Sequence, residues 1–208
     1  MKKILCLLLS LVCVFMLFSC TEVELTAGEK FVEIINSKSP TKITTLYSYT
    51  LASGESASSK LVTEIEGNDS ITTYVVERFA TLAEAADGDV IRKEGVIYYK
   101  DGRYSEDNVS FTAEAPDIGM AHVKFNIDTS KMSSYEISED LTTLTAFLTA
   151  DEVKEILGLD VAIDGELELT VMNNGTYLTK VSVFYETVSG GSVQIDTSYT
   201  YNVVSLYD

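Results

Sequence analysis

The sequence predicts an antiparallel α+β domain, in which two or three helices cover one side of a large curved sheet of about ten strands. Three observations lead to this prediction. Short segments rich in Thr, Tyr, Val and Ile alternate apolar and polar residues, which is the pattern of half-buried strands. Short turn sequences join many of these segments, so neighbouring strands run antiparallel. Two other segments carry helix-start signals followed by apolar residues at helical spacing.

The chain begins with a predicted export signal, residues 1–19, that is not part of the fold. Lys2 and Lys3 precede an apolar run that is shorter than the ~20 residues of a membrane-spanning helix. The run ends in "LFSC", which resembles the lipobox of bacterial lipoproteins. The resemblance implies that Cys20 is acylated, as with palmitate, and becomes the first mature residue. An ordinary cleaved signal and an uncleaved anchor are the alternatives.

The cysteine count agrees with an anchor. Cys6 and Cys13 lie inside the apolar run, so Cys20 is the only thiol left in the mature chain and no intramolecular disulfide can form. Stable attachment to a membrane needs at least two acyl chains, which the diacylglyceryl group implied by the resemblance supplies. We therefore expect a protein that is lipid-anchored on the extracytoplasmic side of the cell membrane.

Residues 20–25 are expected to form the acylated tether and residues 26–208 a single domain. The chain has 15 Lys and Arg against 32 Asp and Glu, a net charge of −17, and removal of Lys2 and Lys3 lowers it to −19. An acidic surface of this kind repels nucleic acid and anionic lipid headgroups. We expect no nucleic-acid partner, and we expect the acyl anchor to hold the protein at the membrane.

The first element after the tether is a predicted helix. Thr26 and Glu29 have the spacing of a capping box, and Pro40 ends the helical segment. Strands follow from residue 42, with "ASGESASSK" (52–60) as a flexible hairpin connection and a brief helical turn over 81–88. The strands are predicted over 42–51, 61–67, 70–79 and, on either side of an Asp101-Gly102 turn, within 89–105.

The middle of the chain is predicted to contain a strand over 120–127 and a second helix over 149–158. Thr149 and Glu152 repeat the capping-box spacing at the start of that helix. Residues 135–148 allow either a helix or a hairpin, and the Thr-rich second half favours the hairpin. Three alternating strands then form a meander over 165–172, 176–188 and 192–204, joined by "NNG" and "SGG" turns.

This order of elements resembles the LolA/LppX-like superfamily of bacterial lipoprotein carriers and lipid-binding lipoproteins, and the uncharacterised Gram-positive lipoproteins of the same layout. The stretches that carry the resemblance are "GVIYYKDGRYS", "ADEVKEILGLDV" and the final meander from "DGELELTVM" to "DTSYTY". It implies an open β half-barrel capped by helices, with a lipid or other hydrophobic ligand between them. The residues implied to line the cavity are Tyr47, Tyr49, Val181, Val183, Tyr185, Ile195, Tyr199 and Tyr201.

An ordinary core would give the same alternation on these strands. The number of tyrosines on the inward face favours a ligand or partner, because each buried hydroxyl needs a hydrogen-bond partner. The leading hypothesis is therefore a non-enzymatic lipoprotein of the envelope that binds a hydrophobic ligand. The alternative is a surface interaction module that contacts a protein or a cell-wall glycan.

No catalytic constellation is apparent in the sequence. His122 is the only histidine and has no nucleophile motif nearby. The carboxylate pairs Asp87/Asp89 and Glu106/Asp107 lie in turns without the ligand spacing of a calcium loop. The chain has no phosphate loop and no dinucleotide fingerprint. We expect no cofactor, no metal and no enzymatic activity.

Overall fold

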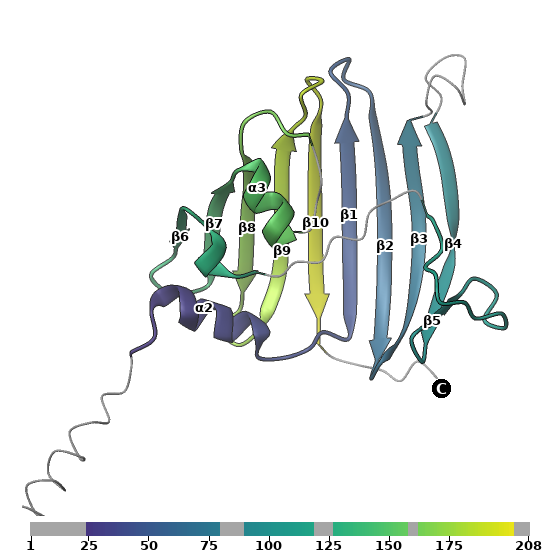
Figure 1. Ribbon diagram of the computed structural model, residues 1–208, viewed down its shortest axis with the longest axis horizontal. Helices are drawn as coiled ribbons and strands as arrows, with labels where there is room; N and C mark the ends of the chain where they lie inside the picture. Colours follow the sequence, from purple (N-terminus) through teal and green to yellow (C-terminus); the bar gives the residue numbers. More distant parts are fainter. Residues whose placement is uncertain (1–23, 80–89, 119–126, 158–161, 202–208) are drawn as a thin grey trace, which may run out of the picture.

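The computed structural model describes residues 24–79, 90–118, 127–157 and 162–201, and it shows the predicted class of fold. Ten antiparallel strands form one open curved sheet with helices on one face (Figure 1). We call the side that the helices cover the inner face. The strands are β1 (Lys42–Thr50), β2 (Ser56–Glu66), β3 (Asp69–Phe79), β4 (Val90–Lys100), β5 (Arg103–Ser105), β6 (Tyr135–Ile137), β7 (Thr143–Leu148), β8 (Leu167–Asn173), β9 (Leu178–Glu186) and β10 (Ser192–Thr200).

The sheet consists of two meanders that meet at its centre. The strand order is β5-β4-β3-β2-β1-β10-β9-β8-β7-β6, so the first and last strands are neighbours. The register pairs Tyr47 with Ile195 and Thr45 with Thr197. Because side chains alternate between the two faces of a strand, these residues all point to the inner face. At the β4–β5 turn, Asp101 and Gly102 have φ of 50° and 79°, as the predicted mirror-image turn requires.

Two helical segments cover the inner face of the β6–β10 half (Figure 1). Helix α2 (Ala27–Asn36) starts with the predicted capping box of Thr26 and Glu29, and its Phe31 and Ile35 are buried. The second segment, α3 (Ala150–Glu152), also has its predicted capping box. It continues as a π-helical turn, η2 (Val153–Leu157), which differs from the regular helix that we expected. A 3-10 turn, η1 (Thr129–Lys131), lies near α2.

Residues 135–148 form the hairpin β6–β7 and not a helix. The Ser138 hydroxyl accepts hydrogen bonds from the backbone N–H groups of Thr142 and Thr143, and Leu141 has a positive φ of 57°. The Asn173 side chain donates to the Leu141 carbonyl at 2.7 Å. In a helix, these backbone N–H and carbonyl groups would bond to one another. In this turn, the side chains of Ser138 and Asn173 bond to them instead.

One predicted loop is shorter in the structure. Residues 52–60 were expected to be a flexible connection, but β2 already begins at Ser56, and Ala57 and Ser59 are each 5% exposed. These small residues occupy inward positions, where larger side chains would have signalled a strand. The predicted helical turn over 81–88 lies outside the described residues, as does the predicted strand over 120–127 except Ile127.

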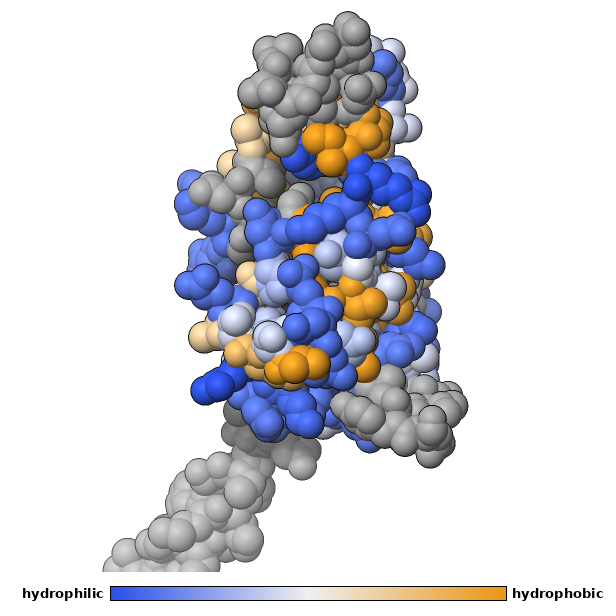
Figure 2. Space-filling model, turned by 90° about the vertical axis from the view of Figure 1, so that its right-hand side faces the viewer, coloured by the Kyte–Doolittle hydropathy of each residue, from blue (hydrophilic) through white to orange (hydrophobic). Residues whose placement is uncertain are grey.

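The inner face carries two hydrophobic clusters. The larger one lies beneath α2 and η2 and is formed mainly by β7, β8, β9 and β10. The smaller one lies over β2, β3 and β4 and consists of Leu61, Tyr74, Val76, Ile97 and Ile118, with Tyr104 packed against it. Along the β4–β5 edge the surface is mainly hydrophilic, with apolar patches between the polar side chains (Figure 2).

Candidate functional site

Four of the eight sequence-predicted lining residues lie inside the larger cluster. Val181 and Val183 are 0% exposed, Ile195 is 1% exposed and Tyr185 is 4% exposed. They pack in one cluster with Phe31 of α2 and with residues of η2. In this structure these side chains form a packed interior beneath the helices, and their role as a cavity wall stays a prediction.

Three further lining residues lie where the helical cover ends. Tyr47 and Tyr49 on β1 and Tyr199 on β10 pack against the larger cluster but remain partly exposed. The Tyr49 ring also meets the Phe79 ring edge to face, with centroids 5.8 Å apart. The centre of the inner face therefore presents accessible aromatic side chains.

Tyr201 lies apart from this group, just after β10. It is 6% exposed, and its ring stacks at a tilt on Tyr177 with centroids 4.2 Å apart. The Lys38 ammonium lies 5.7 Å from the centroid of each ring, within range of a cation–π interaction. Tyr201 thus ties the end of β10 to the segment after α2 and to the β8–β9 turn.

Small hydroxyl side chains pair across neighbouring strands on the inner face. The hydroxyls of Thr45 and Thr197 are 3.1 Å apart across β1 and β10. Those of Thr63 and Thr72 are 2.9 Å apart across β2 and β3. The polar atoms of these four short side chains are therefore hydrogen-bonded to one another in pairs.

Three tyrosine hydroxyls of this face have raised pKa values. Burial is the largest cause that raises the pKa of Tyr47, Tyr185 and Tyr199 above the ordinary tyrosine value. The Tyr185 hydroxyl donates toward the Tyr47 hydroxyl, which partly offsets the effect on Tyr47 and adds to the effect on Tyr185. The face therefore offers a ligand hydrogen bonds and aromatic surface.

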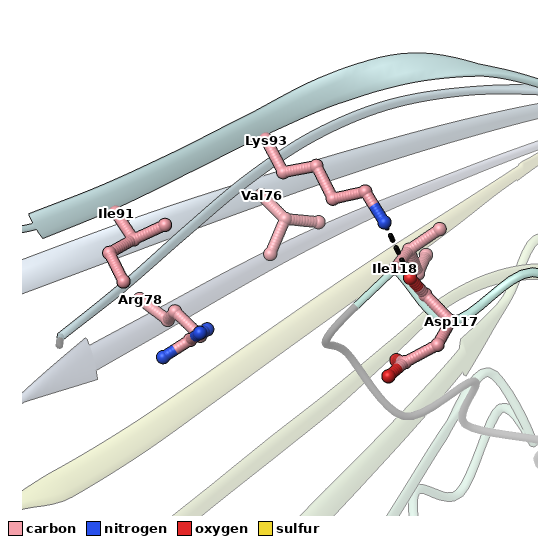
Figure 3. Close-up of a pocket in the computed structure, with 6 residues that line it drawn as sticks. All are labelled: Val76, Arg78, Ile91, Lys93, Asp117 and Ile118. Atoms are coloured by element: carbon pink, nitrogen blue, oxygen red, sulfur yellow. Dashed lines mark hydrogen bonds between the residues drawn. The ribbon is translucent and has the colours of Figure 1, made fainter. Parts of the chain in front are cut away.

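A cavity of about 170 Å³ lies on the inner face, at the end of the smaller cluster (Figure 3). Lys93 on β4 reaches across it and donates from Nζ to the Asp117 carbonyl at 2.6 Å. Ile118, which is 2% exposed, packs onto the sheet beside it. The residues that line the cavity are Val76, Arg78, Ile91, Lys93, Asp117 and Ile118.

Sequence reasoning did not select this cavity, although a signal was present. In "VIRKEGVIYY" (90–99), Lys93 occupies the same alternating face as Ile91 and Ile97, where an apolar residue is expected. Arg78 likewise follows Tyr74 and Val76 on the inward face of β3. A cation in an inward position can indicate a binding site. A second cavity, of about 350 Å³, lies at the β4–β5 turn beside Lys100, Asp101, Arg103 and Phe111.

Within the described residues, no group of three or more His, Cys, Asp or Glu side chains could hold a metal ion. Cys20 and His122 lie outside those residues. The helices in the described ranges are all too short or too polar to cross a membrane.

No protein-family model matches the chain, and neither does any curated protein. Among solved structures, the chain is similar to a LolA superfamily protein from Nitrosomonas europaea, at 12% identity and a TM-score of 0.29. The match covers 86% of this chain and 93% of that protein. The assignment to the LolA/LppX-like superfamily stays a prediction from the sequence, and the half-barrel fold is described from its own strands and helices.

Proposed function

We propose that this protein is a membrane-anchored envelope lipoprotein that binds a lipid or other hydrophobic ligand on the inner face of its sheet, without catalysing a reaction. The observation that carries the proposal is that the helices of the described residues lie over only part of this face. Helices lie over the β6–β10 half, and among the described residues none lies over β1 to β4 (Figure 1). The partly exposed rings of Tyr47, Tyr49 and Tyr199 lie at the border between the two halves.

The inner face has the composition of a ligand site. Ligand sites combine apolar walls with a few polar groups that fix orientation. Here two apolar clusters flank the hydroxyl side chains of Thr45 and Thr197 and the tyrosine rings. A ligand laid along the centre of the sheet would contact both clusters.

Native mass spectrometry with solvent extraction tests this proposal, on residues 21–208 produced without the anchor. Every described strand and helix begins after residue 26, so this segment keeps all of them. We expect a lipid-sized adduct at a fixed stoichiometry, which Tyr49→Asp removes because a charge on the inner face disfavours an apolar ligand. Tyr98→Asp is the matched control, because Tyr98 is also partly exposed but lies on the outer face. A clean apo mass that persists after incubation with membrane lipids would reject ligand binding.

The anchor is tested separately in cells that make the whole chain. Cys20→Ser should abolish incorporation of labelled palmitate and release the protein from the membrane fraction. Retention of the variant on membranes, with an uncleaved signal, would instead support the alternative of an uncleaved anchor.

A second candidate function is the surface interaction module, and the outer face favours it. Phe147 and Phe184 are 54% and 39% exposed, and the register places both beside Glu168 on the intervening strand. Exposed aromatic rings around a carboxylate suit a protein or glycan partner. Co-sedimentation with purified cell walls that Phe147→Ala reduces, in a chain that carries no lipid, would favour this candidate.

A further inference from the structure

We propose that the open edge of β4, which is its side facing away from β3 over residues 90–96, pairs antiparallel with the same edge of a second copy of this chain. Two ten-stranded sheets would thereby join into one continuous sheet. This inference goes beyond the proposed function, because it depends neither on a bound ligand nor on an anchor at Cys20.

Strand β5 covers only one end of this side of β4. β4 has 11 residues, and β5 pairs only with Tyr98, Tyr99 and Lys100. Among the described residues, no strand pairs with the rest of that side, and Figure 1 shows none beside the upper part of β4. Residues 90–96 contain no proline, and their pairing with β3 has no bulge. An unpaired edge of this kind is a template for another strand.

The direction of the backbone groups on β4 follows from the hydrogen bonds of β5. The N–H and C=O of Tyr104 bond to Thr112, both at 2.8 Å, so they point away from β4. Hydrogen-bonded and non-hydrogen-bonded pairs alternate in an antiparallel ladder, so Tyr98 and Lys100 are the β4 residues that bond to β5. The same alternation directs toward the open edge the backbone groups of Val90, Arg92, Glu94 and Val96. These groups have no hydrogen-bond partner among the described residues.

The side chains of the open edge are self-complementary in one register. Residues directly opposite each other in a pair lie on the same face, so a twofold axis perpendicular to the sheet must pass through one residue position. With that axis at Lys93, Arg92 lies opposite the partner's Glu94, and Val90 lies opposite the partner's Val96. Both pairs occur twice by symmetry. The outer face of the junction would then have opposite charges at its centre and apolar side chains at both ends.

The adjacent registers lack this match. An axis at Arg92 or at Glu94 would place two like charges directly opposite each other, which is unfavourable. The axis at Lys93 places two lysines opposite each other on the inner face, but each has a partner in its own chain. The Lys93 Nζ donates to the Asp117 carbonyl at 2.6 Å, toward Ile118 of the smaller cluster (Figure 3). The two ammonium groups would therefore point away from the junction.

The exposure of these side chains also suits a partner. Val90 is 44% exposed, and the side chains of Arg92 and Glu94 are 57% and 64% exposed. Figure 2 faces this edge and shows apolar patches between polar side chains. Arg92 already lies 3.0 Å from Glu94 of its own chain, so the junction would hold a network of two arginines and two glutamates. One short strand from each copy makes a small interface, so we expect a weak and reversible dimer.

Sedimentation velocity of residues 21–208 over a range of concentrations tests the dimer. Glu94→Arg should weaken self-association about tenfold, because it places arginine side chains opposite each other at two symmetric positions. Glu66→Arg is the matched control, since Glu66 is exposed on β2 away from the open edge, and it should leave the affinity unchanged. Both variants change the net charge equally, so a difference between them does not come from overall repulsion. Thermal scans show that each variant is folded.

A single cysteine tests the register. Residues 21–208 contain no cysteine. Lys93→Cys places a thiol on the twofold axis, where the two Cα atoms of a non-hydrogen-bonded pair lie ~4.5 Å apart, within the range of a disulfide. Mild oxidation should therefore give a covalent dimer. Glu94→Cys should not crosslink, because its two copies lie diagonally, at ~8 Å. Lys60→Cys, an equally exposed lysine on β2, is the control for random collision.

Three results would overturn the proposal. The first is a chain that stays monomeric at about 1 mM, where even a weak interface forms dimers. The second is a dimer that Glu94→Arg leaves unchanged, because association would then use another surface. The third is a Lys93→Cys chain that crosslinks no faster than Lys60→Cys, which would exclude the register with the axis at Lys93. None of these results bears on ligand binding by the inner face.

Discussion

At the scale of single residues, a glycine and a tyrosine show how the smaller cluster is packed. Gly95 on β4 lies directly opposite Tyr74 on β3. A Cβ atom at Gly95 would come within 2.7 Å of the Tyr74 hydroxyl oxygen and 2.9 Å of its Cζ. The Tyr74 ring, which is 3% exposed, therefore occupies the space that a side chain on the neighbouring strand would fill.

The substitution Gly95→Ala should lower the free energy of unfolding by about 1–3 kcal/mol, the usual cost of overpacking a core. The Tyr74 ring must move to admit the methyl group, but Leu61, Ile97 and Ile118 surround it. Denaturant titration measures the change. Glu94→Ala, an exposed neighbour, is the control and should change stability by less than about 1 kcal/mol. An unchanged midpoint for Gly95→Ala would show that the ring has room to move.

Elements of the fold are joined by single side chains in several places, and Glu152 is an example. Its carboxylate accepts the backbone N–H of Ser133 at 2.6 Å and the N–H and hydroxyl of Thr149 at 2.8 and 2.7 Å. These hydrogen bonds lower the pKa of Glu152 from 4.5 to about 2, and the bond from the Ser133 N–H has the largest effect. One carboxylate thus caps α3 and also joins α3 to the segment that follows η1.

This contact predicts a pH dependence of stability. Because the folded-state pKa lies below the unfolded value, the contribution of Glu152 is complete above about pH 4.5 and is lost as the pH falls toward about 2. The melting temperature of Glu152→Gln should therefore lie below that of the unmodified chain at neutral pH, and the difference should narrow in acid. Thermal scans from pH 7 to pH 2.5 measure it, with Glu168→Gln on the outer face as the control. A gap that stays constant down to pH 2.5 would contradict the assignment.

The elements were largely predictable because alternation and capping are local signals. The capping boxes at Thr26 and Thr149 both form as their spacing predicts. The start of β2 was missed because Ala57 and Ser59 are small, so their inward positions carry no apolar signal. The π turn after Glu152 depends on how Val153, Ile156 and Leu157 pack against the sheet, which spacing along the chain does not specify.

The site was predictable only as a face of the sheet. Alternation places Tyr49 and Val183 on one side, and both lie there. Alternation does not say which strands the helices cover, so it could not separate the enclosed Val183 from the accessible Tyr49. Arg78 and Lys93 were missed because a charged residue in a strand is ordinarily assigned to the solvent.

For the whole molecule, the acidic charge predicts weak attraction to membrane surfaces. Residues 21–208 lack Lys2 and Lys3 and carry a net charge of −19, so they should not co-sediment with phosphatidylglycerol vesicles in about 0.1 M salt. The whole chain, acylated at Cys20 as we propose, should co-sediment through that anchor. Binding of the unanchored segment that weakens as salt is added would instead reveal a basic surface able to dock on anionic lipid.

The pairing of the first strand with the last one has a consequence for how the chain folds. Tyr47 and Ile195 are direct partners across β1 and β10, although almost the whole domain lies between them in sequence. Closing so long a loop costs entropy, and non-local pairings of this kind slow folding. The two meanders are built from local hairpins and can form early, each with an unpaired central edge until β10 meets β1. The centre of the inner face at that junction is therefore assembled last, after both meanders have formed.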